Sequence, residues 1–368
     1  MTAERDIAEF TIPFAVGTFA AVYLPVPHYS FSLISLSLVA ALTAILMHPY
    51  HKTLSNNTLV CVLVLTSALS GVFIGYSAEI SESMGGYSGV LMNMAAGIAL
   101  SVKEAIMSLP FSEPENKALL TALVTGDRHG LSIETIEAFR QSGAAHILAL
   151  SGMHLGIIYG LLKGAMSSIG NGRTAKIMKS SIIISICSLY TLATGAGASI
   201  TRALLFIILG EIAMLSGRYR STATILSGSL LIQLILSPSS AKDVGFQLSY
   251  AAMAGIAYIY PRLKKLWPEK NEDEGIVRRI LRWIWNSASM SIACQITTGP
   301  IAWIYFGTFP QYFLLTNLMA IPLVSIIIPS GLLTLCLECC GICPAILIEG
   351  TEWLMTLMRE GLEIIASF

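Results

Sequence analysis

The sequence predicts an all-α, polytopic membrane protein with roughly ten or eleven transmembrane helices and an interfacial helical hairpin. Of its 368 residues, 54% are hydrophobic and only 12% are charged, whereas a soluble domain carries about 25% charged residues. Its mean hydropathy is +0.71. Apolar runs of roughly 17 to 22 residues follow one another, and each is long enough to cross the ~30 Å hydrocarbon core as a helix. The ~10-residue alternating segments of a strand barrel do not appear.

The apolar runs predict transmembrane helices near 11–26, 31–47, 58–76, 144–163, 180–197, 199–216, 221–236, 246–260, 283–306 and 312–334, with a further one at 344–367. Four regions follow: N-terminal transmembrane helices at 1–76, periplasmic or interfacial amphipathic helices at 77–143, the main membrane domain at 144–348 and a C-terminal helix at 349–368. The first ten residues lack the basic segment of a signal peptide, so we expect the N-terminus to stay on the mature protein.

The distribution of Lys and Arg predicts the orientation of these helices. The joints 163–179, 216–222 and 261–282 hold thirteen basic residues, whereas the two intervening joints hold only Lys242. Short cytoplasmic loops are enriched in Lys and Arg. We therefore expect the three basic joints and the N-terminus to be cytoplasmic, and 77–143 to lie outside.

The predicted outer region begins with the apolar stretch 90–102, which is too short to span and suits a helix in the membrane interface. Ser112 and Glu115 have capping-box spacing and should begin a helix that runs through Val124. Glycines at 126 and 130 should break that helix.

A second short helix is expected from Ser132 to Gly143, which makes a helical hairpin on the outer surface. Asp127 and Arg128 lie at its tip, where we expect them to contribute to an entrance or to pair with each other.

The most informative run is 140–156, which places Arg140, His146, Ser151 and His154 along the start of a hydrophobic segment. Ionisable groups inside a membrane usually face a cavity or a partner helix. Ser151 and Gly152 form a plausible point for the helix to break. The alternative is that both histidines hydrogen-bond to neighbouring helices and that Ser151 permits close packing.

Later segments carry further isolated polar groups. Arg202 lies near the outer end of its span, where its head group is able to snorkel to the interface. Asp243 and Gln247 share a helical face at a helix start, and the alternative for Asp243 is an ordinary N-cap. Gln295 and Thr298 precede the Gly299–Pro300 pair, which should kink that span, and Asn317 lies within the next.

Other features exclude several classes of site. The net charge is zero and no long basic run occurs, so the chain lacks the electrostatic footprint of a duplex-binding protein. No nucleotide-binding loop is present. The cluster Cys336, Cys339, Cys340 and Cys343 has the spacing of metal ligands, but buried Cys is common in apolar segments. We expect neither a metal nor a cofactor.

Six segments, in this order, resemble the competence domain of the ComEC family, and together they cover roughly 112–330. They are Ala118–Asp127, Arg140–Gly156, Ser199–Ala203, Asp243–Tyr250, Gln295–Pro300 and Asn317–Pro322. The resemblance implies a multi-pass channel in the bacterial inner membrane for uptake of single-stranded DNA in natural transformation, and no enzyme activity. The candidate translocation path then comprises Asp127, Arg128, Arg140, His146, Ser151, His154, Arg202, Asp243, Gln247, Gln295, Thr298 and Asn317, with 144–348 as the competence channel domain.

Full-length members of that family resemble a three-part machine with an oligonucleotide-binding β-domain and a metallo-β-lactamase-like domain. About forty residues between the third span and Leu119 are too few for such a barrel, and no His-x-His-x-Asp-His run occurs. Those modules are encoded separately, lie beyond this sequence, or are missing because the channel has another task. The implied partners are single-stranded DNA, membrane lipid, a separate DNA receptor and an ATP-dependent translocase, and assembly with further copies of the chain is left open.

Two other function classes stay open from the residues alone. Broken helices with polar groups near the membrane midplane also suit a small-solute or ion transporter. Ser151 with a nearby His resembles the Ser/His arrangement of an intramembrane serine hydrolase.

Overall fold

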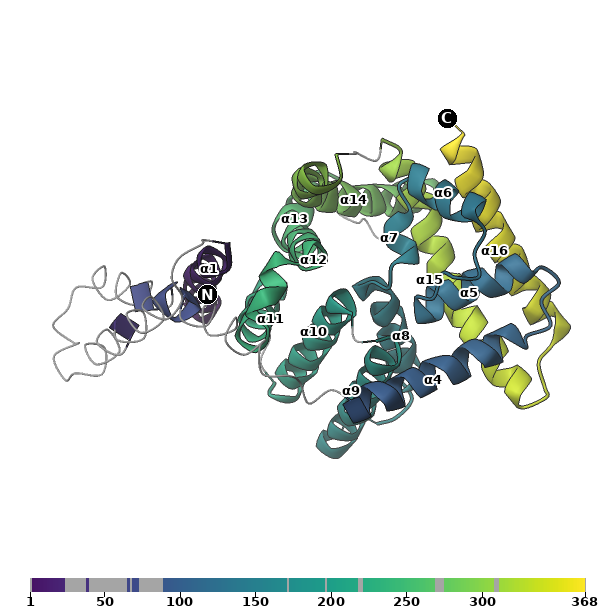
Figure 1. The fold of residues 1–368 in the computed structure, drawn as a ribbon, viewed down its shortest axis with the longest axis horizontal. Coiled ribbons are helices and arrows are strands. Elements are labelled where there is room, and N and C mark those ends of the chain that lie inside the picture. The colour runs from purple at the N-terminus through teal and green to yellow at the C-terminus, as the bar shows by residue number, and fades with distance from the viewer. Residues whose placement is uncertain are drawn as a thin grey trace. The chain divides into compact units, whose positions relative to one another are not determined.

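The computed structural model describes residues 2–23, 38–39, 65–66, 68–72, 89–170, 172–195, 197–217, 221–268, 275–307 and 311–367. Every regular element among these residues is a helix (Figure 1), which confirms the all-α class. The predicted spans at 31–47 and 58–76 lie largely outside the described residues.

Two of the described helices are long and apolar enough to cross a membrane, α9 (Arg173–Ala193) and α15 (Phe313–Cys339). Only 22% and 33% of their most apolar windows are buried inside the protein. A soluble protein would bury such faces in its core, so the chain is an all-α helical membrane protein. Thr11–Tyr23 and α11 (Thr222–Leu236) are shorter apolar helices, and the total number of crossings stays a prediction.

The chain folds as two compact units. The first comprises Met1–Tyr87 and Leu209–Ala257, and the second comprises Ser88–Ile208 and Tyr258–Phe368. In the first unit, α1 (Thr2–Tyr23) packs on α11, on the short 3-10 helix η2 (Pro238–Lys242) and, through Phe19 and Phe246, beside α12 (Val244–Ala254). In the second unit, residues from the predicted regions 77–143, 144–348 and 349–368 share one hydrophobic core.

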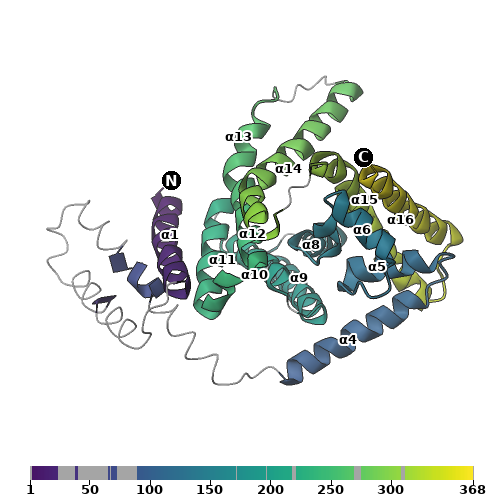
Figure 2. The ribbon, with the colours of Figure 1, turned by 45° about the horizontal axis from the view of Figure 1, so that its top comes forward.

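The second unit contains most of the candidate residues. Its helices are α4 (Gly89–Met107), α5 (Pro114–Thr125), α6 (Ile133–Gln141), α7 (Ala145–Leu148), α8 (Gly152–Ala165), α9, the first part of α10 (Ala198–Leu215), α13 (Tyr260–Lys264), α14 (Ile276–Phe306), α15 and α16 (Ala345–Ala366). Figure 2 shows α5 and α6 beside α15 and α16. The π-helical turn η3 (Gly255–Ile259) precedes α13.

Helix α5 lies inside the core of the second unit, whereas an amphipathic helix was predicted there. Eight of its twelve residues are buried, because its run from Ala118 to Val124 offers no polar face. Leu120 packs so closely on α15 that a Cβ added to Gly331 would stand 2.5 Å from Leu120 Cδ1. Helix α6 is amphipathic as predicted, since among its residues only Thr135, Ala138 and Phe139 are buried.

The predicted ends of the hairpin helices are partly confirmed. Ser132 caps α6 by accepting from the Thr135 backbone N–H at 3.1 Å, and Gly126 ends α5 in the left-handed conformation at φ 79°. The predicted Ser112 capping box is wrong, because Glu113 is the N-cap residue and makes no side-chain cap. The Glu115 carboxylate instead turns toward α6.

A polar connection fixes the start of α5 on the C-terminal helix. Glu113 forms an ion pair with Arg359 at 2.8 Å, and its backbone N–H donates to the Glu352 carboxylate at 2.8 Å. The buried Asn116 donates from Nδ2 to Thr356 Oγ1 at 3.1 Å. Helix α16 is therefore part of the wall around the hairpin.

Candidate functional site

The predicted break in the hydrophobic segment is confirmed at residues 149–151. Helix α7 ends at Leu148, Ala149 is extended (φ −81°, ψ 128°), and α8 begins after Ser151. Ser151 Oγ accepts from the Met153 backbone N–H at 3.3 Å and so caps α8. A polar side chain at this position favours a new helix start over continuation.

His154 completes a capping box with Ser151. Its Nδ1 accepts from the Ser151 backbone N–H at 3.2 Å and lies 3.0 Å from Ser151 Oγ. A nitrogen that accepts from an amide carries no hydrogen, so neutral His154 bears its hydrogen on Nε2. Its side chain is fully buried, and Nε2 has no hydrogen-bond partner among the described residues. The Nε2–H group of His154 is therefore a buried donor at the break without an acceptor among the described residues.

The tip of the hairpin lies directly against this break. Arg128 Nε donates to the carbonyl oxygen of Leu148 at 3.0 Å. A Cβ added to Gly126 would stand 2.6 Å from Leu150 Cδ1, so only a glycine fits beneath Leu150 without a shift. The residues of the predicted tip and of the predicted break therefore form one site.

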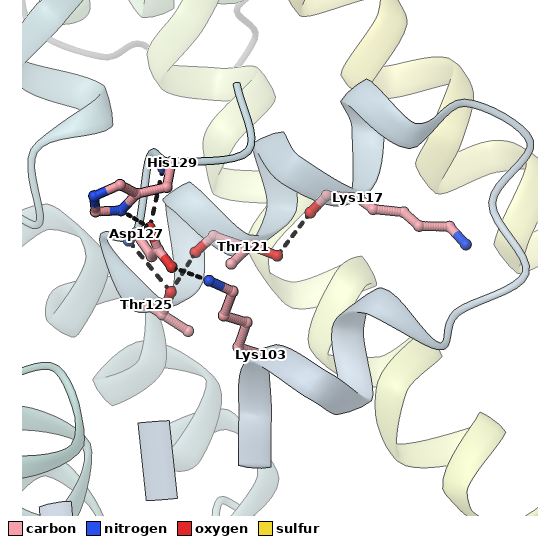
Figure 3. Close-up of polar contacts among 6 residues, drawn as sticks. All are labelled: Lys103, Lys117, Thr121, Thr125, Asp127 and His129. Atoms are coloured by element: carbon pink, nitrogen blue, oxygen red, sulfur yellow. Dashed lines mark hydrogen bonds and ion pairs between the residues drawn. The ribbon is translucent and has the colours of Figure 1, made fainter. Parts of the chain in front are cut away.

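Asp127 faces the other way and joins the tip to α4 (Figure 3). Its carboxylate is paired with the Lys103 ammonium and lies 2.6 Å from His129 Nδ1. The Lys103 hydrogen bond, followed by those from the backbone and ring of His129, holds the pKa of Asp127 well below its usual range. The predicted pairing of Asp127 with Arg128 is wrong, since each side chain bonds to a different helix.

Glu115 links the two arms of the hairpin. Its Oε1 accepts from the Ser132 backbone N–H at 3.0 Å, from Ser132 Oγ at 2.9 Å and from Thr135 Oγ1 at 2.7 Å. Partial burial alone would raise its pKa, but the hydrogen bonds from Thr135 and Ser132 outweigh burial and lower it.

Neighbouring helices enclose the site from two further directions. Tyr190 on α9 donates its hydroxyl to the carbonyl of Val124 at 2.8 Å, near the end of α5. A Cβ added to Gly152 would stand 3.2 Å from Ala203 Cβ, which places the start of α8 against α10. Arg202, one residue earlier on α10, is 4% exposed. Arg202 is therefore buried rather than snorkelling into solvent.

The hydrogen bonds of Arg140 and His146 lie within their own segments and not with Ser151 or His154. Arg140 is exposed on α6 and pairs with Glu137 at 3.1 Å. Hydrogen bonds from Gln141 and Arg140 lower the pKa of Glu137. His146 is exposed and lies 3.1 Å from the Gly143 carbonyl through Nδ1. Both side chains are exposed on the surface of the unit, and their depth in the membrane stays a prediction.

Asp243 and Gln247 belong to the first compact unit. Asp243 accepts from the Gly245 backbone N–H at 3.0 Å, which confirms the N-cap alternative. Gln247 Nε2 donates to the Ala241 carbonyl at 2.9 Å and to the Tyr23 hydroxyl at 2.8 Å. These contacts fix α12 on η2 and α1.

The remaining candidates lie on α14 and α15. Thr298 donates to the Cys294 carbonyl at 2.8 Å, Gln295 is half-buried, and α14 continues through Pro300 to Phe306. Asn317 Oδ1 is buried without a hydrogen-bond partner in the described part of the chain. Its neighbour Thr316 donates to the Ser142 carbonyl at 2.6 Å, which joins α15 to the end of α6.

The four clustered cysteines are not arranged as a metal site. Cys336, Cys339 and Cys340 are exposed and Cys343 is partly exposed. No group of three or more His, Cys, Asp or Glu side chains within the described ranges is placed to hold a metal ion.

Several of the site's residues were not predicted as such from the sequence. Lys103 follows the predicted interfacial stretch 90–102 and was not predicted as a site residue, and neither were His129, Leu150 and Tyr190. The one available signal for Lys103 was an isolated cation on an otherwise apolar stretch.

The site can be compared with known proteins. The sequence matches the family described as Competence protein over residues 123–368. The chain is 27% identical over 238 residues to ComE operon protein 3 of Bacillus subtilis (strain 168), across 63% of this chain and 28% of that protein. It therefore spans well under half the length of this relative. No solved structure matches the chain. The family match covers more than half of the chain and includes the hairpin tip and the helix break, so the chain belongs to the competence protein family.

Proposed function

We propose that the chain forms the membrane-embedded part of a conduit for single-stranded DNA in the bacterial inner membrane, used in natural transformation. The observation that carries the proposal is the α7–α8 break of a competence-family member, where a buried imidazole N–H has no hydrogen-bond partner in the part of the chain that the structure describes. A broken helix lined by protein is how membrane proteins expose polar backbone at depth.

The chemistry of the break suits a passing phosphate backbone. The half-buried Ser151 and the buried His154 place a hydroxyl and a neutral imidazole at the break, and the N-terminal end of α8 favours negative charge. Conduction requires contacts that are favourable enough to admit the ligand and weak enough to release it. Neutral donors meet that requirement better than a cluster of fixed cations.

The conduit is proposed to be multi-pass with a cytoplasmic N-terminus, since the basic joints 163–179, 216–222 and 261–282 suit the cytoplasmic side. Its energy is expected to come from a separate ATP-dependent translocase, and a separate receptor is expected to deliver the DNA. Assembly of several copies is part of the same hypothesis.

Uptake measurements test the proposal against a small-solute transporter. In cells that depend on this chain, deletion should abolish entry of labelled single strands and leave the flux of small solutes unchanged. Loss of solute flux with DNA uptake retained would instead support the transporter.

The 3.0 Å contact between Ser151 Oγ and His154 Nδ1 also fits a second candidate, an intramembrane serine hydrolase. A catalytic base needs a third group that orients it. Here Nδ1 is shared with the Ser151 backbone N–H and Ser151 Oγ is shared with the Met153 N–H, as in a helix cap. Wild-type protein should not react with a fluorophosphonate probe. Labelling that disappears in Ser151→Ala would favour the hydrolase.

A further inference from the structure

Two adjacent residues at the hairpin tip hold two different helices. The Asp127 carboxylate is paired with Lys103 of α4, and the Arg128 guanidinium donates to Leu148 at the end of α7. The partners lie 24 and 20 residues away in the sequence. The backbone between Asp127 and Arg128 is therefore a short connection from α4 to the helix break.

Helix α7 needs an external partner to end where it does. It has only four residues, far fewer than a helix needs to be stable alone in water. The last carbonyl groups of a helix lack intrahelical partners, and Arg128 satisfies one of them at Leu148 with a charge-assisted hydrogen bond. Leu150, in the break itself, rests on Gly126 of the same tip.

We infer that Arg128 is a positioning residue that sets the place and shape of the α7–α8 break, and that Asp127 couples this break to α4. The consequence for transport rests on the proposed function, but the coupling itself is a property of the fold. A displacement of α4 would therefore move the tip through the Lys103–Asp127 ion pair, and the tip would move the backbone before Ser151 through the Arg128–Leu148 hydrogen bond.

Amide hydrogen exchange of the full chain in lipid nanodiscs, followed by mass spectrometry, tests the inference without DNA. Arg128→Leu should speed exchange at residues 147–154 by about tenfold, because a hydrogen bond to a charged group is lost. Arg128→Lys keeps a charged donor and should restore most of the protection. Lys103→Met should change the same peptide in the same direction by a smaller factor, since it acts through Asp127.

Lys117 supplies a matched control, because its ammonium donates to another helix-end carbonyl, that of Met107, at 3.3 Å. Lys117→Met should leave exchange at 147–154 unchanged. Unchanged exchange in Arg128→Leu, or equal acceleration in Lys117→Met, would overturn the inference. If Arg128→Leu does not fold, exchange at 147–154 is compared between Lys103→Met and Lys117→Met. Faster exchange in Lys103→Met alone supports the inference, and equal exchange in the two overturns it. If the exchange at 147–154 responds to these substitutions as predicted but the wild-type chain takes up no DNA, only the proposed function is refuted, and the inference stands.

Discussion

Gly126 lies so close to Leu150 that a methyl group on Gly126 would stand 2.6 Å from Leu150 Cδ1. Gly126 also has a φ of 79°, a conformation that costs an L-residue roughly 1–2 kcal/mol. The turn that ends α5 therefore packs against the break before α8 only because residue 126 is a glycine and has no side chain.

Gly126→Ala should destabilise the protein by about 2–3 kcal/mol, from backbone strain and from the displaced Leu150. Gly195→Ala is the control, because Gly195 has a φ of 81° and no described residue has an atom within 4 Å of its Cβ position, so only the strain should appear. Thermal unfolding in detergent measures both variants. Equal losses in the two would mean that Leu150 does not press on Gly126.

The Glu115 carboxylate predicts a second pair of outcomes. Glu115→Ala leaves three donors of Ser132 and Thr135 without their acceptor, which should cost about 1–3 kcal/mol. Ser112→Ala should cost almost nothing, because Ser112 is exposed and does not cap α5. If Ser112→Ala lowered the free energy of unfolding more than Glu115→Ala in the same assay, the result would support the capping box at Ser112 after all.

The contacts of Gly126 and of Glu115 show which features of the site the sequence could predict. Ser132, Gly126 and Ser151 act on backbone groups within a few residues, so spacing alone was sufficient to predict their helix ends. Glu115 had the same kind of spacing to Ser112, but its actual donors lie 17 and 20 residues away. A local pattern cannot decide between a near cap and a distant one, because tertiary packing selects the partner.

The long-range contacts of the site were beyond prediction for the same reason. Thr316 meets Ser142 across 174 positions of the chain, and Asp127 selects Lys103 over its neighbour Arg128. The burial of α5 was missed because an apolar run next to a glycine turn suits a surface hairpin and a core helix equally well.

A core position of α5 predicts a large effect of truncation. Leu119 is fully buried, so Leu119→Ala should cost about 2–5 kcal/mol. Ile133 of α6 is 82% exposed, and Ile133→Ala should change the unfolding free energy by less than about 0.5 kcal/mol. A change of less than about 0.5 kcal/mol in the unfolding free energy of Leu119→Ala would show that α5 is not packed in the core.

The ion pair between Asp127 and Lys103 predicts a pH dependence. The folded-state pKa of Asp127 is lowered, so its contribution is complete above the unfolded pKa of about 3.9 and is lost as the pH falls through the lower folded value. Asp127→Asn should therefore cost about 1 kcal/mol, a value reduced by the partial exposure of Lys103.

The difference between wild type and Asp127→Asn should stay constant from about pH 8 to pH 5 and shrink only in stronger acid. Both proteins are compared in a His129→Ala background, so that the contact between His129 Nδ1 and the Asp127 carboxylate is absent from both. A difference that disappears between pH 8 and pH 5 would show that the carboxylate is not held by Lys103.

Photocrosslinking tests most directly whether single-stranded DNA passes the α7–α8 break. Transforming DNA that carries 4-thiothymidine is given to cells that rely on the unmodified chain, the cells are irradiated during uptake, and the crosslinked peptides are mapped. The account predicts crosslinks within residues 149–154, around Ser151 and His154. Normal uptake with crosslinks elsewhere in the chain and none in this segment would contradict it.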